Sequence, residues 1–318
     1  MVSKKYPKIT VVTPAHNDLL HIIPFLASLR EVNYPNLEAI IIDDGSTDRT
    51  SAAIKKQFPE VIVLQGNGDL WWSGATNKGV KESIKRGADF IFTVNNDVLL
   101  DVNIFSELIK CASINPMALI GCKILYLDKP KKVWYFGAYL DDKSADIKII
   151  DGQDKDFRER KEVQVLTGMG VLIPKEVFSK IGFYDDVRMP QYLADSDFSL
   201  RAADKGYRCL VEPNAKLYSD VNSSWVHKQL KDPKLVFIWQ CYFARRSPYS
   251  IPVRYTFYRR HWGKYYMAVL FKFYILFFKN FIVHGFLRVY ISKKLYFLKP
   301  VARKAREYKR YVQSMGKK

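Results

Sequence analysis

Short apolar runs alternate with helical stretches through the first hundred residues, and this alternation restricts the fold more than any other feature of the chain. Apolar runs at residues 9–13, 39–42, 61–64 and 90–94 have the length and composition of buried strands. The stretches between them carry apolar residues at helical spacing, with the third helix expected at residues 75–86. Strands that alternate with helices form parallel sheets with both faces covered. The sequence therefore predicts an α/β fold with a Rossmann-like, mostly parallel, doubly wound sheet.

Beyond residue 115 the pattern changes. Strands are expected near residues 118–126, 133–140 and 163–173, and helices near 174–181 and 196–205. Because helices no longer separate successive strands, this part predicts a mixed extension of the sheet.

Acidic residues follow two of the predicted strands directly. Asp43 and Asp44 open the loop DDGSTD, in which Gly45 permits a tight turn and Ser46 or Thr47 can cap the next helix. Ligands of open α/β sheets bind at the carboxyl ends of strands, where a carboxylate can accept hydrogen bonds from a base and a ribose. A solvated acid pair beside a helix cap explains the same residues equally well.

Asp97 ends the segment VNND after the fourth predicted strand. A lone Asp at a strand end is commonly structural. A diphosphate leaving group, however, needs its charge neutralised, and a hard divalent cation held by carboxylates does this. Asn95 and Asn96 can add only neutral contacts.

Two further segments are candidates for substrate binding. The glycine-rich loop at residues 66–79 contains the adjacent tryptophans Trp71 and Trp72, which suit the wall of a sugar pocket better than a core position. Asp195 and Asp197 precede an amphipathic helix that contains Arg201. They are either acids that favour the helix dipole or the source of a catalytic base.

These segments, in this order, resemble the family-two glycosyltransferases of the GT-A fold across residues 8–246. The resemblance is carried by TPAHND, DDGSTD, the loop at 67–79, VNND in place of an Asp-x-Asp motif, LTGMGVLIPKEVFSKIGFYDD, and DSDFSLRAADKGY in place of a Glu-Asp-x-Asp segment. The Asn-Asn-Asp motif and the segment YFARR at 242–246 are most similar to bacterial rhamnosyltransferases of surface polysaccharide synthesis.

The resemblance implies a role for each matching residue. Asp97 would bind Mg²⁺ or Mn²⁺, and Asp195 would be the general base of an inverting, metal-dependent transfer. Asp197, Arg201, Trp71 and Trp72 would support the base or the acceptor. The nucleotide would contact Pro14, Asn17, Asp43, Asp44 and Asn77.

The chain departs from the family pattern in two places. Ala194 stands where an acid often precedes the base. Where many members have a metal-binding His, this chain has Ser219 and Asp220, so Asp220 or His227 would complete the cation site.

The positive charge of the chain is concentrated near its C-terminus. Of the formal net charge of +19, most comes from residues 254–318, which hold 17 Lys and Arg and one acid, Glu307. An anionic membrane surface is the expected partner, because no nucleic-acid-binding motif accompanies the charge. The apolar stretch at residues 265–290 is interrupted by Lys272, Lys279 and Arg288, which predicts a helix lying in the interface plane rather than a spanning one.

Two regions are expected: a catalytic domain at residues 1–230 and a basic, aromatic, helical, membrane-associating region at 231–318. Neither a signal peptide nor a disulfide is expected, because the N-terminus lacks a long apolar run and the four cysteines are far apart. We expect a cytoplasmic enzyme, peripheral at the inner face of the cell membrane.

The expected donor is a nucleotide-diphosphate sugar, with dTDP-rhamnose as the first choice and UDP-hexose or UDP-galactofuranose as alternatives. The acceptor would be a hydroxyl of a glycan or lipid-linked glycan. The alternative outside the enzymes is a catalytically degenerate scaffold protein that binds a nucleotide sugar without transferring it. A nucleotidyltransferase is disfavoured because residues 13–16 supply no glycine-rich basic loop.

Overall fold

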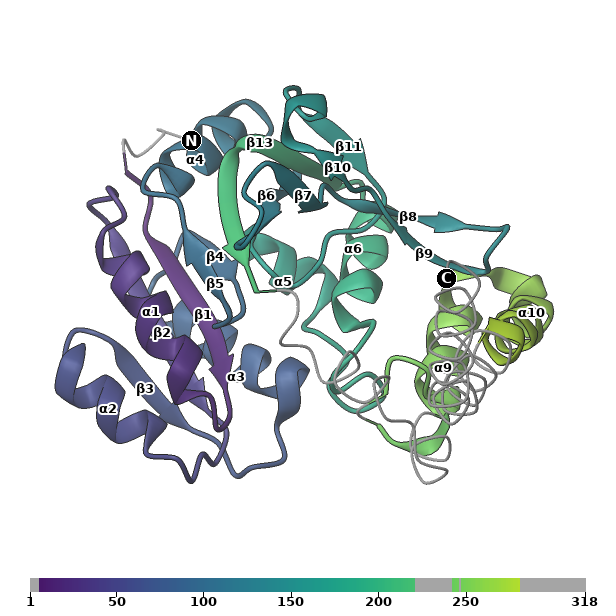
Figure 1. Ribbon diagram of the computed structural model, residues 1–318, viewed down its shortest axis with the longest axis horizontal. Helices are drawn as coiled ribbons and strands as arrows, with labels where there is room; N and C mark the ends of the chain where they lie inside the picture. Colours follow the sequence, from purple (N-terminus) through teal and green to yellow (C-terminus); the bar gives the residue numbers. More distant parts are fainter. Residues whose placement is uncertain (1–5, 221–241, 246, 281–318) are drawn as a thin grey trace, which may run out of the picture.

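The computed structural model describes residues 6–220, 242–245 and 247–280 of the chain (Figure 1). A large sheet runs through the centre of the molecule, with helices on both of its faces. The α/β fold predicted from the sequence is thereby confirmed.

The N-terminal half of the sheet is parallel. β1 (Ile9–Ala15) lies between β2 (Leu37–Asp43) and β4 (Phe90–Thr93) and pairs with both. On its far side, β2 pairs with β3 (Ile62–Gln65). The chain therefore adds strands on one side of β1 and then crosses to the other side. Such a reversal leaves a crevice at the carboxyl ends of the central strands.

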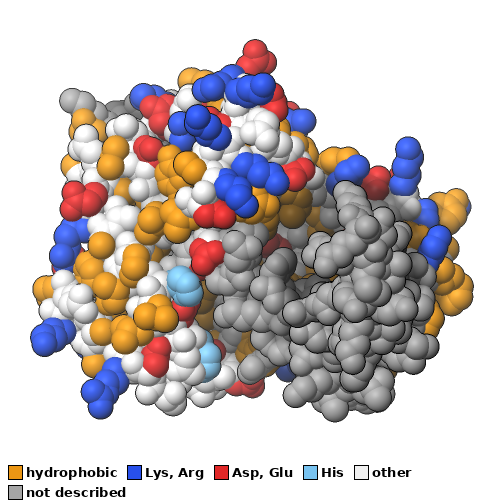
Figure 2. All heavy atoms as spheres, viewed as in Figure 1, with side chains coloured by type: hydrophobic (Ala, Val, Ile, Leu, Met, Phe, Trp, Pro, Cys, Tyr) orange, Lys and Arg blue, Asp and Glu red, His pale blue; other side chains and the backbone are white. Residues whose placement is uncertain are grey.

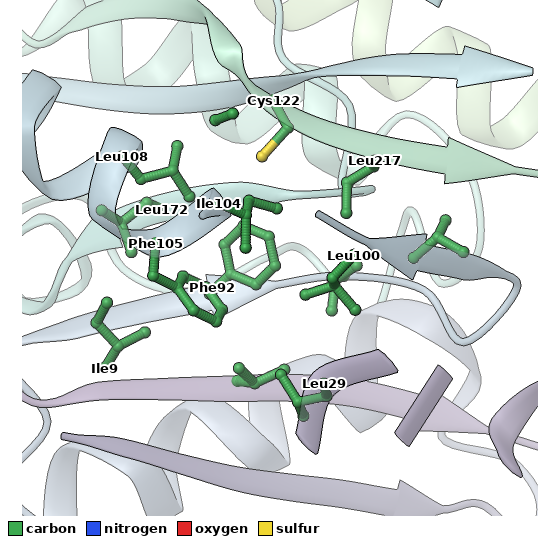
Figure 3. Packing of buried hydrophobic residues seen from close by; sticks show 14 of the residues in the cluster. Ile9, Leu29, Phe92, Leu100, Ile104, Phe105, Leu108, Cys122, Leu172 and Leu217 are labelled. Carbon is green, nitrogen blue, oxygen red and sulfur yellow. The ribbon is translucent and has the colours of Figure 1, made fainter. Parts of the chain in front are cut away.

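Alternate residues of each strand face opposite cores, since successive side chains of a strand point to opposite faces. Val11 packs with α1 (Leu19–Arg30), α2 (Thr50–Gln57) and α4 (Ile104–Ile114). Val12 packs with α3 (Trp71–Lys85), α5 (Lys175–Ile181) and α6 (Ala194–Asp204). Figure 3 shows the first core, where Phe92 of β4 lies against Phe105 of α4 with ring centroids 5.0 Å apart.

The C-terminal half of the sheet is mixed, as predicted. β12 (Val171–Pro174) runs antiparallel to β4 and also pairs with β6 (Ala118–Tyr126), which continues to β7 (Lys132–Tyr135) and β10 (Gly152–Gln153). β13 (Arg208–Ser219) pairs with β6, β11 (Lys161–Val163) and β5 (Val98–Leu100). β8 (Ala138–Asp141) and β9 (Asp146–Ile149) form a separate hairpin.

Several predicted boundaries differ from the structure. The single strand expected at 163–173 is two strands, and β13 was not predicted at all. α3 begins at Trp71 rather than near residue 75, so both tryptophans lie in its first turn. Ser46 and Thr47 do not cap α2. The N-cap residue is Arg49, and Asp48 before it accepts the Thr50 N–H at 3.0 Å with one oxygen and the Leu19 N–H of α1 at 3.1 Å with the other.

The described helices of the C-terminal region pack on the same core as the sheet. Residues Val253 and Phe257 of α9 (Ile251–His261) and Phe273 of α10 (Tyr266–Asn280) join the cluster that contains α3, α5 and α6. A short 3₁₀ turn, η3 (Gly263–Tyr265), links the two helices, which lie beside β8 and β9 in Figure 1. The domain boundary expected near residue 230 lies outside the described residues, as do His227 and Cys241. Cys111, Cys122 and Cys209 are free and buried.

Within the described ranges, none of the helices combines the length and the apolar character that crossing a bilayer requires.

Candidate active site

A cleft of about 520 Å³ opens where β1, β2 and β4 end. This is the crevice that the strand order predicts. Its lining combines small residues of turns with side chains that carry indole, amide, imidazole and carboxylate groups. The lining residues are Pro14, Ala15, His16, Asp18, Asp44, Gly68, Trp71, Trp72, Asn95, Asn96, Gln191 and Tyr192. Such a mixture of flat apolar surfaces and convergent polar groups is typical of small-molecule sites.

Asp44 lies at the floor of this cleft and is almost fully buried. Its Oδ1 accepts the Gly68 N–H at 2.8 Å, and its Oδ2 accepts the N–H groups of Leu70 and Trp71, both at 2.9 Å. The carboxylate thus fixes the glycine-rich loop and the start of α3. Because a carboxylate has about four acceptor positions, one remains for a ligand.

Asn17 joins the turns after β1 and β2. Its Oδ1 accepts the Thr47 N–H at 2.7 Å, and its own N–H donates to Ser46 Oγ at 2.9 Å. Asp43 is buried beneath the same turn, where its Oδ1 accepts the Ser46 N–H at 3.0 Å and its Oδ2 accepts the Ser51 hydroxyl. Asp43 therefore shapes the turn and is absent from the lining of the cleft.

Trp71 and Trp72 both line the cleft. Trp72 is held on three sides: its Nε1 donates to Asn95 Oδ1 at 2.9 Å, its N–H donates to Gln191 Oε1 at 3.2 Å, and its ring lies edge-on to Tyr184. Both tryptophans therefore line the cleft, while Trp72 also packs against the hydrophobic core, and their role as the wall of a sugar pocket stays a prediction.

Three residues around the site have left-handed backbone conformations that are uncommon outside glycine. These are Asn17 (φ 49°), Trp71 (φ 60°) and Leu193 (φ 68°). Strained residues of this kind concentrate at functional sites. Their positions therefore agree with the cleft as the working site of the molecule.

Acids and a histidine gather behind the two asparagines of VNND. Asn96 Nδ2 donates to Asp18 Oδ2 at 2.9 Å, and His21 Nδ1 pairs with the other oxygen of Asp18. Figure 2 shows histidine side chains beside acidic ones near the middle of this face. His16, Asp18, Gln191 and Tyr192 were not among the predicted site residues. Asp18 is at the N-cap position of α1, which is typical of a structural residue, and Gln191 and Tyr192 lie in a loop without a recognisable pattern.

Asp97 and Asp220 are brought together by the sheet. Antiparallel pairing of β5 with β13 places Val98 opposite Ser219, and the Asp220 N–H approaches the Asp97 carbonyl oxygen at 3.4 Å. Asp97 Oδ1 is buried and has no hydrogen-bond partner among the described residues. Burial raises the pKa of Asp97, and the charges of Asp18 and Asp220 add to that rise, while a backbone hydrogen bond and His21 oppose it.

These oxygens suit a hard divalent cation such as Mg²⁺ or Mn²⁺. The protein donors are few, however. Across residues 6–220, 242–245 and 247–280, no three His, Cys, Asp or Glu side chains form a group that could hold a metal ion. The diphosphate and water would have to supply the other ligands.

Asp195 occupies the first turn of α6, next to the wall that Trp72 forms. Its Oδ2 accepts the Gly168 N–H at 2.9 Å, and its Oδ1 accepts the Ser196 N–H at 2.7 Å. A Cβ placed on Gly168 would lie only 2.1 Å from the Trp72 ring. The backbone of Gly168 therefore contacts both the Asp195 carboxylate and the Trp72 indole. Burial raises the pKa of Asp195, although these backbone hydrogen bonds oppose the rise.

Asp197 and Arg201 lie in an ionic network around the buried Asp197 carboxylate, and neither residue lines the cleft. Asp197 Oδ2 accepts Arg201 Nε at 2.7 Å, and its Oδ1 accepts Arg260 Nη1 at 2.6 Å and pairs with His261 Nε2 at 2.9 Å. Arg201 also donates to the carbonyl oxygens of Ile181 and Phe183. Asp197 therefore joins α6 to α9, and Arg201 joins α6 to the end of α5 and the loop after it.

Asn77 also lies outside the lining of the cleft. Its amide is paired at both ends with the backbone of Tyr184: Nδ2 donates to the carbonyl oxygen at 2.9 Å, and Oδ1 accepts the N–H at 3.0 Å. Asn77 thereby attaches α3 to the loop that carries Gln191 and Tyr192.

The fold and the cleft define an α/β protein with a nucleotide-type crevice at its strand-order reversal. The family described as "Glycosyl transferase family 2" matches residues 10–182, which is more than half of the chain. The protein belongs to this family.

Individual proteins resemble the chain more distantly. The probable glycosyltransferase YdaM of Bacillus subtilis is 22% identical over 232 residues, which cover 70% of this chain and 53% of YdaM. The chain spans between 27% and 66% of the length of the curated relatives it matches.

Two solved structures show the same fold at low sequence identity. The mannosyltransferase PcManGT from Pyrobaculum calidifontis, in complex with GDP-Man and Mn²⁺, has a TM-score of 0.56 and 14% identity. That match covers 93% of this chain and 82% of PcManGT. Residues 1–349 of TarS from S. aureus, in complex with UDP-GlcNAc, have a TM-score of 0.53 and 15% identity, covering 87% of this chain and 73% of that one.

Proposed function

We propose that this protein is an inverting glycosyltransferase that moves a sugar from a nucleotide-diphosphate donor to an acceptor hydroxyl. The observation that carries the proposal is the cleft at the ends of β1, β2 and β4, walled by two indoles, in a chain of glycosyl transferase family 2. Indole faces suit the apolar faces of a sugar, and the turns beside them suit a nucleotide.

The nucleotide would occupy the side of the cleft formed by the turns after β1 and β2. Pro14 and Asp44 line this side, and Asn17 and Asp43 hold its turns in place. The remaining acceptor position of Asp44 would take an N–H of a uracil or thymine ring, or a ribose hydroxyl.

Asp97 and Asp220 do not line the cleft themselves, but they would hold Mg²⁺ or Mn²⁺ close to Asp18, which does line it. When bound, the cation neutralises charge on the departing diphosphate. Support comes from the buried Oδ1 of Asp97, which has no hydrogen-bond partner in the part of the chain that the structure describes, and from the strand pairing that brings Asp220 beside it. His227 remains a second candidate ligand outside the described residues. The related folds with GDP-Man and Mn²⁺ or with UDP-GlcNAc suggest a donor of the same class.

Asp195 would accept the proton of the acceptor hydroxyl. As the acceptor oxygen forms its bond to the anomeric carbon, the bond from that carbon to the diphosphate oxygen breaks on the opposite face, which inverts the configuration. The hydrogen bonds from Gly168 and Ser196 orient the carboxylate for this task. Asp197 and Arg201 would support it indirectly, by fixing α6.

We propose dTDP-rhamnose as the donor and a glycan or lipid-linked glycan of bacterial surface polysaccharide synthesis as the acceptor. The support is the Asn-Asn-Asp motif at residues 95–97, in which Asn95 braces the sugar-side tryptophan. UDP-hexose and UDP-galactofuranose are the competing donors. The catalytic part would end near residue 230, and the remainder would keep the enzyme at the cytoplasmic face of the membrane.

A thermal-unfolding screen tests the donor. Each nucleotide sugar is added with Mn²⁺, and a ligand at 100 times its Kd should stabilise the protein by about 2.7 kcal/mol. If none of the nucleotide sugars raises the unfolding temperature, the proposal is wrong. Nucleotide release that depends on a glycan acceptor then separates an enzyme from a scaffold that binds the donor without using it.

A further inference from the structure

One side of α10 exposes large apolar side chains along its whole length. Met267, Phe271, Ile275 and Phe278 are 54%, 71%, 52% and 58% exposed. Their spacing of four, four and three residues puts them on one side of the helix. We call these four residues the α10 stripe. So many large apolar side chains exposed side by side mark an interaction surface rather than ordinary surface composition.

The opposite side of α10 is packed against the rest of the protein, so the orientation of the helix is fixed by these contacts. Leu270 and Phe273 are buried, and the guanidinium of Arg254 lies 3.7 Å from the centre of the Phe273 ring. Tyr274 donates its hydroxyl hydrogen to the carbonyl oxygen of Tyr249 at 2.7 Å. The helix therefore has one fixed orientation, with the α10 stripe on the outside.

The helical segment that carries the stripe is positively charged. Residues 251–280 contain no Asp or Glu. Lys272 and Lys279 are seven residues apart and border the stripe, and Lys264 lies just before the helix; all three are exposed. Lys272 Nζ reaches the Asp142 carbonyl oxygen at 2.7 Å, which ties this border to the β8–β9 turn. Figure 2 shows hydrophobic and basic side chains together at the right-hand edge of the molecule, where Figure 1 places α10.

We propose that the α10 stripe docks on an anionic lipid surface, with the helix axis parallel to the bilayer. Phe271 and Phe278 would enter the boundary between headgroups and acyl chains, and the lysines would lie at the level of the phosphates. A second copy of the chain fits less well. A symmetric pairing of two stripes would set one basic border against the other, and like charges across an interface repel.

This docking would hold the cleft near lipid-linked acceptors, and only that consequence rests on the proposed function. Membrane binding itself needs neither donor nor catalysis. It can therefore be measured separately from sugar transfer, so failure of one proposal leaves the other intact.

Co-sedimentation of the full chain with vesicles of phosphatidylglycerol and phosphatidylcholine tests the proposal. The variant F271S/F278S should bind at least about tenfold more weakly, because burying each phenyl group is worth roughly 1.5–3 kcal/mol and 1.4 kcal/mol is a tenfold change. Leu20→Ser is the matched control, since Leu20 is 85% exposed on α1, away from the stripe. Unchanged unfolding temperatures for both variants would show that they are folded.

Vesicle binding equal to that of the parent in F271S/F278S would overturn the proposal. So would equal binding to pure phosphatidylcholine vesicles, because the basic border would then have no role. The variant K264Q/K279Q should weaken binding to anionic vesicles about fivefold for each lysine at low salt. A parent dimer that becomes monomeric in F271S/F278S would assign the stripe to a second copy instead and would also overturn the proposal.

Discussion

Gly168 lies where three parts of the site meet: its N–H binds Asp195, its Cα faces the Trp72 ring, and Trp72 in turn binds Asn95. A Cβ at this position would lie 2.1 Å from Cζ2 and 2.5 Å from Cη2 of the indole. Because the Trp72 ring is held by Asn95 and Tyr184, it cannot move aside freely. The absence of a side chain at residue 168 is therefore a condition for the wall of the cleft.

We predict that Gly168→Ala lowers the free energy of unfolding by about 1–3 kcal/mol, because of overpacking against Trp72. Urea denaturation measures this loss. Gly74→Ala is the control: a Cβ there would meet its nearest atom at 3.5 Å, inside a helix where Ala is favoured. Equal stability of the two variants would contradict the contact between Gly168 and Trp72.

Asp195→Asn should reduce turnover by about 10²–10⁴-fold, the usual contribution of a general base, while donor binding remains. Donor binding is read from the thermal shift, and turnover from nucleotide release. A parental turnover number in this variant would exclude Asp195 as the base.

The pH dependence of the parent adds an independent test. Burial raises the pKa of Asp195 above the ordinary value for an aspartate of about 3.9, and a base works only when it is deprotonated. The acid limb of the rate profile should therefore have its midpoint above that value. A midpoint at or below about 3.9 would contradict the role.

The sequence pointed to Asp44 because β2 is an apolar run with an abrupt end, and Asp44 lines the cleft. Asp97 was proposed on the same ground after β4, and its role stays a prediction. The three N–H groups bound by Asp44 come from residues 24 to 27 positions later, and no local pattern announces them. The role of Asp197 was equally hidden, since Arg260 and His261 are more than 60 residues away in the chain.

At the scale of elements, the network around Asp197 joins the α6 helix that carries Asp195 to helix α9. Asp197 is fully buried and has two arginines and a histidine as partners. Burial alone would raise its pKa, but hydrogen bonds from His261 and Arg201, with the charge of Arg201, lower the pKa below its usual value. The charged form is thus the one that the folded protein stabilises.

We predict that Asp197→Asn costs about 1–3 kcal/mol of unfolding free energy, because it weakens the charge-assisted hydrogen bonds that the buried carboxylate accepts from Arg201 and Arg260. Glu60→Gln is the control, since it breaks the exposed pair with Arg30 and should cost less than about 1 kcal/mol. The stabilisation by Asp197 should be complete above the pKa of an unfolded aspartate and disappear as the pH falls through the lowered folded value. A variant that is as stable as the parent at neutral pH would rule out this role for the network.

Elements were predictable where burial is uniform. β1, β2 and β4 are almost unbroken apolar runs because helices cover both faces of the parallel sheet. β13 was missed because Glu212, Pro213, Asn214 and Lys216 interrupt its apolar residues. The structure accommodates them at a register shift between Glu212 and Lys216, and Glu212 pairs there with Arg160 at 2.9 Å.

At the scale of the whole molecule, binding of cation and donor should appear as added stability. With a nucleotide-diphosphate sugar present, Mn²⁺ should raise the unfolding temperature of the parent, and Asp97→Ala should abolish this increment because it removes a proposed ligand. Asp128→Ala removes the same charge from an exposed position and serves as the control. A full Mn²⁺ response in Asp97→Ala would exclude Asp97 from the cation site.

The position of β13 has a consequence for how the protein is made. β6 is buried along nearly all of its length and pairs with β13 from Ala118↔Arg208 to Tyr126↔Ser219. A ribosome adding 5–20 residues per second needs roughly 5–20 s to proceed from the start of one strand to the start of the other. During that interval the nascent chain presents an open, apolar edge, so this stage of synthesis is where a chaperone would be needed most.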